Sequence, residues 1–87
     1  MSTPAAAKAV LLGRLRRAEE QAESLARLKE QIREAVAQVD MAISGSATGV
    51  DRRALAELQA NLDELDRLVR TMRAAVLEGR RFAESLA

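Results

Sequence analysis

The chain has 87 residues, the size of one small domain, and its 14 basic and 13 acidic residues leave a net charge of +1. It lacks cysteine and histidine, and this excludes disulfides, thiolate or imidazole metal sites, and catalysis by cysteine or histidine. Tryptophan and tyrosine are absent as well. We therefore expect neither an enzyme nor a cofactor. The near-neutral charge gives no general reason to expect nucleic acid or an anionic membrane as the partner.

The segment MSTPAAAKAVLLGRLRRAEE opens the chain. Its apolar run AVLL, between Lys8 and Gly13, is shorter than the 7–15 residues of a signal-peptide core, and no later run is long enough to span a membrane. We expect a cytoplasmic protein, and the usage rich in alanine and arginine is typical of a bacterial one.

The first predicted helix covers residues 4–43. Thr3 can cap it, and Pro4 suits its first position, where a missing N–H costs nothing. Ser44 and Gly45 supply a stop, with Gly45 suited to the left-handed position after a helix. Apolar or small residues recur at alternating steps of four and three, with Lys29 as the polar exception: Leu11, Leu15, Ala18, Ala22, Leu25, Ile32, Val36, Val39 and Ile43.

After a turn at residues 44–50, the second predicted helix covers residues 51–86. Asp51 can cap it, and Val50 and Leu55 have the spacing of a hydrophobic staple, while Thr48 with Asp51 is a competing capping box. Its apolar positions follow the same steps: Leu55, Leu58, Leu62, Leu65, Val69, Met72, Val76, Gly79, Ala83 and Leu86.

The two heptad patterns match each other. If residues whose numbers add up to 94 face one another, Val39 meets Leu55 and Leu15 meets Gly79, so that large residues face small ones in the far half. We call the facing residues of both helices the seam. The pattern predicts an all-α fold, a coiled-coil-like antiparallel two-helix hairpin formed by residues 1–87. We expect the hairpin to complete a four-helix bundle with a second copy or with a helical partner.

The two sides of the seam differ in chemistry. On one side, which we call the charged edge, Arg33 can meet Asp66, and Glu19 can meet Arg73 or Arg80. The full charged edge is Glu19, Arg33, Asp40, Gln59, Asp66, Arg73 and Arg80. The other side, which we call the apolar flank, is made of Leu28, Ala35, Ala42, Ala54, Leu68, Ala75 and Phe82, interrupted by Arg14, Gln21 and Asn61.

A lone hairpin has no third layer to cover the apolar flank, although a slightly widened core is an alternative interpretation. We expect a protein–protein interaction module, such as a co-chaperone, adaptor or assembly subunit, that binds another helical protein or itself. The expected partner-binding residues are Val10, Leu12, Leu28, Ala35, Ala42, Leu68, Ala75, Leu77 and Phe82.

The alternative function is an autonomous homodimeric four-helix bundle with a regulatory, basic end that contacts nucleic acid. Its phosphate contacts would come from Arg14, Arg16, Arg17, Arg80 and Arg81. Acidic residues are interleaved with these arginines, and no aromatic residue is placed to stack on bases, so a solvated face is the preferred interpretation.

Three further residues interrupt the pattern. Lys29, opposite Leu65, is expected to extend its ammonium group into water, and a role in fixing the register is the alternative. Gly79 either packs against Leu15 or ends the second helix. Gly13, in the first helix, is either tolerated or marks a hinge.

The layout of residues 12–69, LGRLRRAEEQAESLARLKEQIREAVAQVDMAISGSATGVDRRALAELQANLDELDRLV, is similar to the cytoplasmic co-chaperones for the needle subunit of bacterial type III secretion systems. The stretch ALAELQANLDELDRLV also resembles the second helix of the needle subunits. The chain departs from the needle subunits in a turn without proline and from the co-chaperones in its longer helices. Phage assembly proteins with a helix–SG–helix layout are comparably similar. The resemblance implies a heterocomplex that guards an aggregation-prone polymer subunit through the apolar faces of the hairpin.

Overall fold

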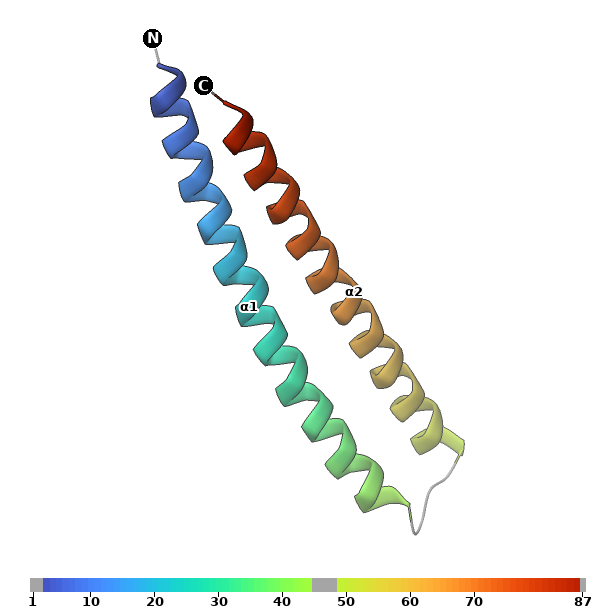
Figure 1. The fold of residues 1–87 in the computed structure, drawn as a ribbon. Helices are drawn as coiled ribbons and strands as arrows, with labels where there is room; N and C mark the ends of the chain where they lie inside the picture. The colour runs from blue at the N-terminus through green and yellow to red at the C-terminus, as the bar shows by residue number, and fades with distance from the viewer. Residues whose placement is uncertain (1–2, 45–48, 87) are drawn as a thin grey trace.

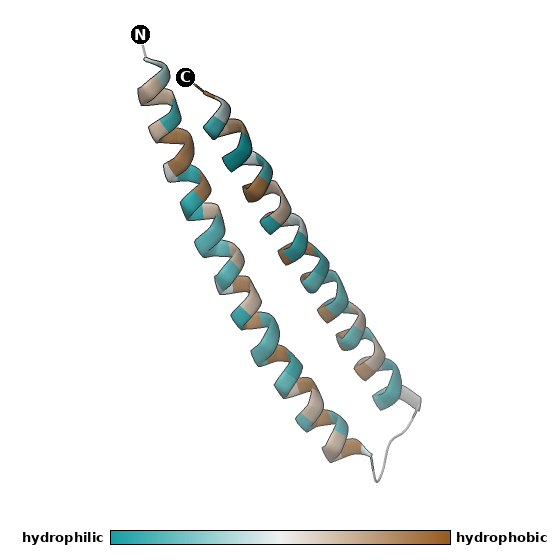
Figure 2. Cartoon of the chain, viewed as in Figure 1, coloured by the Kyte–Doolittle hydropathy of each residue, from teal (hydrophilic) through white to brown (hydrophobic). Residues whose placement is uncertain are grey.

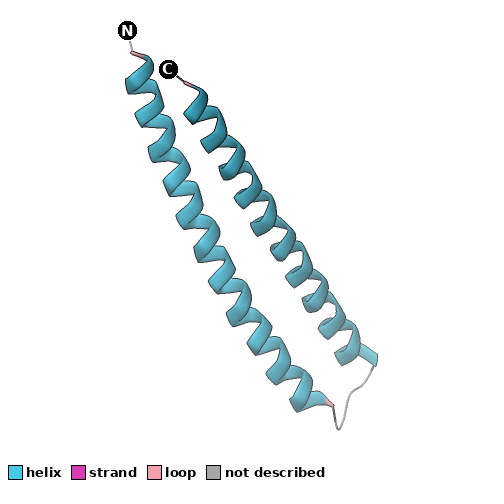
Figure 3. Ribbon diagram, in the orientation of Figure 1, coloured by secondary structure: helices cyan, strands magenta, loops and turns pink. Residues whose placement is uncertain are grey.

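In a computed structural model of the chain, which describes residues 3–44 and 49–86, two long helices pack side by side. Helix α1 spans Pro4–Ile43 and α2 spans Gly49–Ser85. They run antiparallel, and the two ends of the chain lie together at the end opposite the turn (Figure 1). The residues described are helical almost throughout and include no strand (Figure 3). The predicted all-α antiparallel hairpin is confirmed.

Helix α1 begins and ends with local hydrogen bonds from short polar side chains. The Thr3 hydroxyl oxygen accepts a hydrogen bond from the Ala6 amide at 3.0 Å, which satisfies one of the free N–H groups of the first turn. Pro4 occupies the first helical position, as expected. At the other end, the Ser44 hydroxyl donates to the Met41 carbonyl at 2.9 Å.

Helix α2 begins at Gly49, two residues earlier than expected. Asp51 therefore lies in the first turn and not in front of it, where its negative charge still complements the positive end of the helix dipole. The roles expected for Gly45 and Thr48 lie outside the described residues, as does the side chain of Val50 with its expected staple. The helix ends at Ser85, whose hydroxyl donates to the Phe82 carbonyl at 2.6 Å.

Both interior glycines lie within unbroken helix, so Gly79 does not end α2 and α1 continues through Gly13. The two differ in their surroundings. A Cβ atom added at Gly79 would lie 2.5 Å from Leu15 Cδ2, whereas one added at Gly13 would meet nothing within 4 Å. Gly79 therefore allows the two helices to approach closely at Leu15. This contact also supports the register in which facing residue numbers add up to 94.

The hairpin is elongated, and its hydrophobic core is a single thin row. It measures 65 × 18 × 15 Å, and its accessible surface is 6639 Å². A compact protein of 9.5 kDa would expose about 5,000 Å². The fully or almost fully buried residues are Ala22, Val36, Leu62, Val69, Val76 and Ala83.

Candidate interaction surface

The seam consists of two columns of residues on each helix, and these columns differ in burial. Among the residues whose burial the structure describes, six are buried, and all six belong to the column that adjoins the charged edge, in which residues recur every seven positions. The members of this edge-side column are Leu15, Ala22, Lys29, Val36 and Ile43 on α1, and Leu55, Leu62, Val69, Val76 and Ala83 on α2.

No residue of the other column is fully buried. Most of its members are half-buried, and Val39 and Leu58, which were expected in the core near the turn, are exposed. We call it the flank-side column because it adjoins the apolar flank. Its members are Leu11, Ala18, Leu25, Ile32 and Val39 on α1, and Leu58, Leu65, Met72, Gly79 and Leu86 on α2. The core is therefore covered on one side and open on the other.

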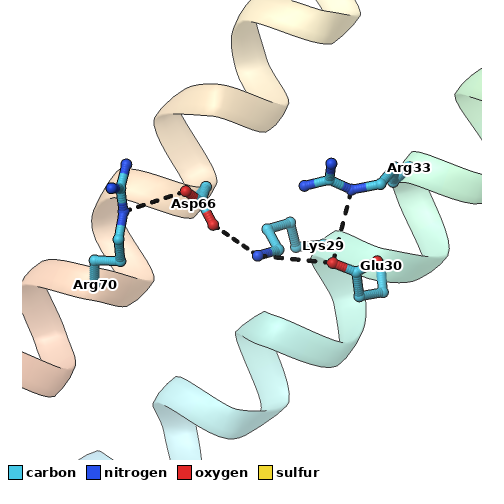
Figure 4. A network of polar contacts seen from close by, with 5 residues as sticks. All are labelled: Lys29, Glu30, Arg33, Asp66 and Arg70. Carbon is cyan, nitrogen blue, oxygen red and sulfur yellow. Dashed lines mark hydrogen bonds and ion pairs between the residues drawn. The ribbon is translucent and has the colours of Figure 1, made fainter.

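An ion-pair network closes the charged edge at the middle of the hairpin (Figure 4). The Lys29 ammonium group donates a hydrogen bond to Asp66 Oδ1 across the helices at 2.7 Å and lies 3.7 Å from Glu30. On the far side of Asp66, Arg70 Nε lies 3.2 Å from its second oxygen. The Lys29 side chain is only 14% exposed. The expectation that its ammonium group extends into water is therefore wrong, because a carboxylate on the opposite helix binds it.

This geometry changes the titration of Asp66. The hydrogen bond from Lys29 is the largest influence and lowers the pKa of the Asp66 carboxyl below its ordinary value, with additional attraction from Lys29, Arg70 and Arg33 that outweighs partial burial. Asp66 is thus held ionised, as the partner of Lys29. A charged pair that spans the seam at one level disfavours other registers of the two helices.

A second ion pair crosses the charged edge nearer the chain ends. There Arg80 donates to Glu19, as expected, with both side chains half-exposed. The expected ion pair between Arg33 and Asp66 does not form. Arg33 Nε instead lies 3.6 Å from Glu30 on its own helix, because Lys29 and Arg70 occupy the Asp66 oxygens.

The apolar flank is exposed along its length. Leu28 is 46% exposed, Leu68 is 48% exposed and Phe82 is 59% exposed, and all four alanines of the flank are exposed as well. Hydrophobic residues recur along both helices from end to end (Figure 2). These side chains therefore leave apolar area in water that a lone hairpin has no means of covering.

The flank continues into the open side of the seam. Leu25 of α1 and Met72 of α2, both in the flank-side column, form the apolar part of a shallow groove whose polar rim is Arg17, Glu20, Gln21 and Ser24. On the charged edge, by contrast, the groove nearest the turn has Val36 and Leu62 at its floor and is otherwise lined mainly by Arg33, Asp40 and Gln59. The main apolar surface of the hairpin is thus the flank, with its interruptions at Arg14, Gln21 and Asn61, together with the flank-side column.

Two of the residues expected to bind a partner lie on the other side of the seam, and a third lies at the border of the apolar flank. Leu77 is half-exposed, but it lines a groove with Glu19 and Arg80 and so belongs to the side of the charged edge. Leu12 lies seven residues before Glu19 and shares that side. Val10 is exposed in a groove of α1 that also contains Leu11 of the flank-side column and Arg14 of the flank, so it borders the apolar flank. The structure therefore places Leu28, Ala35, Ala42, Leu68, Ala75 and Phe82 on one surface, with Val10 at its border, and Leu12 and Leu77 outside it.

The five arginines proposed as phosphate contacts do not form one patch. Arg17 lines the groove beside Leu25, on the open side of the seam, whereas Arg80 contacts Glu19 on the charged edge. Arg81 Nη1 lies 2.9 Å from Glu78. Arg14 lies on the groove of α1 that contains Val10, and Arg16 is exposed. At least two of the five are thus neutralised by glutamates, and the others are dispersed around the end of the hairpin.

The remaining chemistry of the described residues is sparse. Within residues 3–44 and 49–86, no three acidic side chains lie close enough together to hold a metal ion. Over the same part of the chain, no buried side-chain nitrogen or oxygen lacks a hydrogen-bond partner. Neither described helix contains a stretch long and apolar enough to cross a membrane.

Comparison of the chain with models of protein families, with curated proteins and with solved structures gave no match. The features that carry functional information are therefore those of the chain itself. Of these, the open side of the seam was not foreseen from the sequence. The sequence feature that indicates this open side is the difference in side-chain length between the apolar flank and the charged edge. Alanines of the flank cannot reach across the seam, whereas lysine and arginine on the other side can.

Proposed function

We propose that this protein is a non-enzymatic protein–protein interaction module that acts through its apolar flank. The observation that supports the proposal is the exposure of Leu28, Leu68 and Phe82 beside a seam column that the hairpin leaves half-open. Exposed apolar residues that are contiguous along one face, rather than scattered singly, are typical of surfaces that bind another protein.

The kind of partner follows from the shape of this surface. The flank residues of α1 and α2 form two apolar rows on either side of the mostly half-buried flank-side column, and these rows suit the apolar face of another helix or helix pair. A co-chaperone, an adaptor and an assembly subunit all use such a surface, and the resemblance to needle-subunit co-chaperones favours the first of these. We do not extend the proposal to nucleic acid, because Arg80 and Arg81 are already bound to glutamates.

The test compares one substitution on each side of the seam. Leu68→Glu places a charge in the middle of the apolar flank, while Arg33→Glu changes a charged-edge residue that is 56% exposed. Light scattering measures the mass of each purified chain, and an apolar-sensitive dye reports any flank that stays uncovered. We expect the wild type either to assemble or to bind dye, Leu68→Glu to abolish that behaviour, and Arg33→Glu to preserve it.

Circular dichroism shows whether each variant remains helical, so that loss of assembly is separated from loss of folding. Two results would contradict the proposal. One is an equal effect of the two substitutions. The other is a folded wild-type chain that stays at its monomer mass of 9.5 kDa and binds no dye, because such a chain has no adhesive face.

A further inference from the structure

We infer that the apolar flank binds the apolar flank of a second copy of this chain, with the two hairpins antiparallel and Leu28 and Leu68 of both copies at the centre. This inference rests on the proposed function and names the partner of the same surface. Three observations carry it: the position of the two leucines, the distribution of large and small residues around them, and the distribution of charge along the hairpin.

The two large aliphatic residues of the flank lie at the middle of the molecule. Leu68 is 19 residues from the first residue of α2 and 17 from the last. The Lys29–Asp66 hydrogen bond and the Leu15–Gly79 contact fix the register and place Leu28 on a neighbouring level of α1. A two-fold axis through this level therefore brings four leucines together, as a self-complementary interface requires.

In the antiparallel arrangement, residues equally distant from the centre on the same helix meet across the interface. Phe82 and Ala54 are both 14 residues from Leu68, so the aromatic ring of each copy meets an alanine of the other. The polar interruptions Gln21 and Asn61 each meet an alanine in either arrangement, so Phe82 is the flank residue that distinguishes the two. In the parallel arrangement, Phe82 meets Arg14 instead, one large side chain against another. Alternation of large and small residues is what dense packing between helices needs.

Charge selects the same arrangement. The open end of the hairpin, formed by residues 1–24 and 70–87, carries eight basic and five acidic side chains, which gives +3. The turn end, residues 25–69, carries six basic and eight acidic side chains, which gives −2. Antiparallel packing sets the positive end of each copy beside the negative end of the other, whereas parallel packing sets like charges together. Such complementarity fixes the orientation of an interface more than its affinity.

The area available is sufficient for a stable dimer. The hairpin exposes 6639 Å², roughly 1,600 Å² more than a compact chain of its mass would. A standard interface takes about 800 Å² from each partner. Burial of half of the excess from each copy therefore gives an interface of ordinary size, and the product is a four-helix bundle in which neighbouring helices are antiparallel.

Distances between single spin labels test the arrangement directly, because the chain contains no cysteine that would compete for the label. We choose Arg81→Cys and Arg67→Cys in the full chain. The two arginines are matched: both are exposed, lie 14 residues apart on the outer face of α2, and contact a glutamate three residues earlier at 2.9 Å. Arg67 lies at the centre of the proposed dimer, and Arg81 lies near its end.

In the antiparallel dimer, the two labels at position 81 are separated along the axis by about 40 Å, at about 1.5 Å per residue, in addition to the width of the bundle. The two labels at position 67 are separated by the bundle width alone, about 20–30 Å for two helix diameters. We expect a long distance from Arg81→Cys and a short one from Arg67→Cys.

Two results would overturn the inference and would still be compatible with the proposed function. Short distances from both labels mean that the two hairpins pack in parallel. A monomer that shows no dipolar coupling at either position, but binds the apolar-sensitive dye, means that the flank is adhesive toward a different protein. A monomer that binds no dye overturns the proposed function as well, so the two failures are distinguishable.

Discussion

The charged edge and the apolar flank border the same seam, but they cover it to different extents. On the charged edge and in the edge-side column, long side chains reach across, as Arg80 does to Glu19 and Lys29 does to Asp66. On the apolar flank, alanines and leucines end before they cover the seam, and the adjoining column stays half-open. One hairpin can thus cover its hydrophobic core on one side and leave it partly exposed on the other, and the exposed side is available for assembly.

The largest effect is expected from matched valines in the two columns. Val69 is 1% exposed in the edge-side column, whereas Val39 is 45% exposed in the flank-side column. Val69→Ala removes two buried methyl groups and leaves a cavity, at a cost of about 2 kcal/mol in the free energy of unfolding. Val39→Ala is expected to cost less than about 1 kcal/mol, because half of its area is already in water. Urea denaturation of both variants measures the difference, and equal costs would mean that the two columns are buried alike.

The interior glycines give an intermediate effect. Gly13→Ala meets no neighbour and gains helix propensity, so we expect stabilisation by up to about 1 kcal/mol. Gly79→Ala has the same intrinsic gain but forces Leu15 to move, so we expect no net stabilisation. Thermal denaturation followed by circular dichroism compares the two. A gain at Gly79 as large as that at Gly13 would contradict the close approach of the helices at Leu15.

The smallest effect concerns pH. The hydrogen bond from Lys29 lowers the pKa of the folded Asp66 carboxyl, while an unfolded aspartate titrates near a pKa of about 3.9. The stabilisation from this pair is therefore complete above about pH 4 and is lost as the pH falls through the lowered folded pKa. Melting temperatures between pH 7 and pH 2 measure the loss.

Asp66→Asn is expected to flatten this dependence, because the substituted side chain no longer titrates. Asp63→Asn, at an exposed aspartate one turn earlier on α2, serves as the control and should retain the wild-type slope. If the two variants lose the same part of the pH dependence, the link between Lys29 and Asp66 does not stabilise the hairpin.

Much of the fold could be predicted because it depends on local rules and on simple periodicity. Thr3 and Pro4 determine the start of α1, and the matched heptads determine the pairing of Leu15 with Gly79. The start of α2 was missed by two residues, since several capping residues compete before Asp51 and the choice among them depends on the turn.

The candidate surface could be predicted only in part. Its position beside Leu28 and Leu68 follows from spacing, but the exposure of Val39 and Leu58 depends on how far the neighbouring side chains reach. The partner of Lys29 was missed for a related reason. A lysine at a seam position can extend into water or across to a carboxylate, and only the three-dimensional distance to Asp66 decides between them.

The central claim is that assembly buries the apolar flank and leaves the charged edge in water. It is tested most directly by the rate at which a thiol reagent modifies a single cysteine at Leu68→Cys or at Arg33→Cys, measured over a range of protein concentrations. We predict that modification at position 68 slows markedly as the protein concentration rises, while modification at position 33 stays constant. Equal rates at the two positions, unchanged by concentration, would contradict the claim.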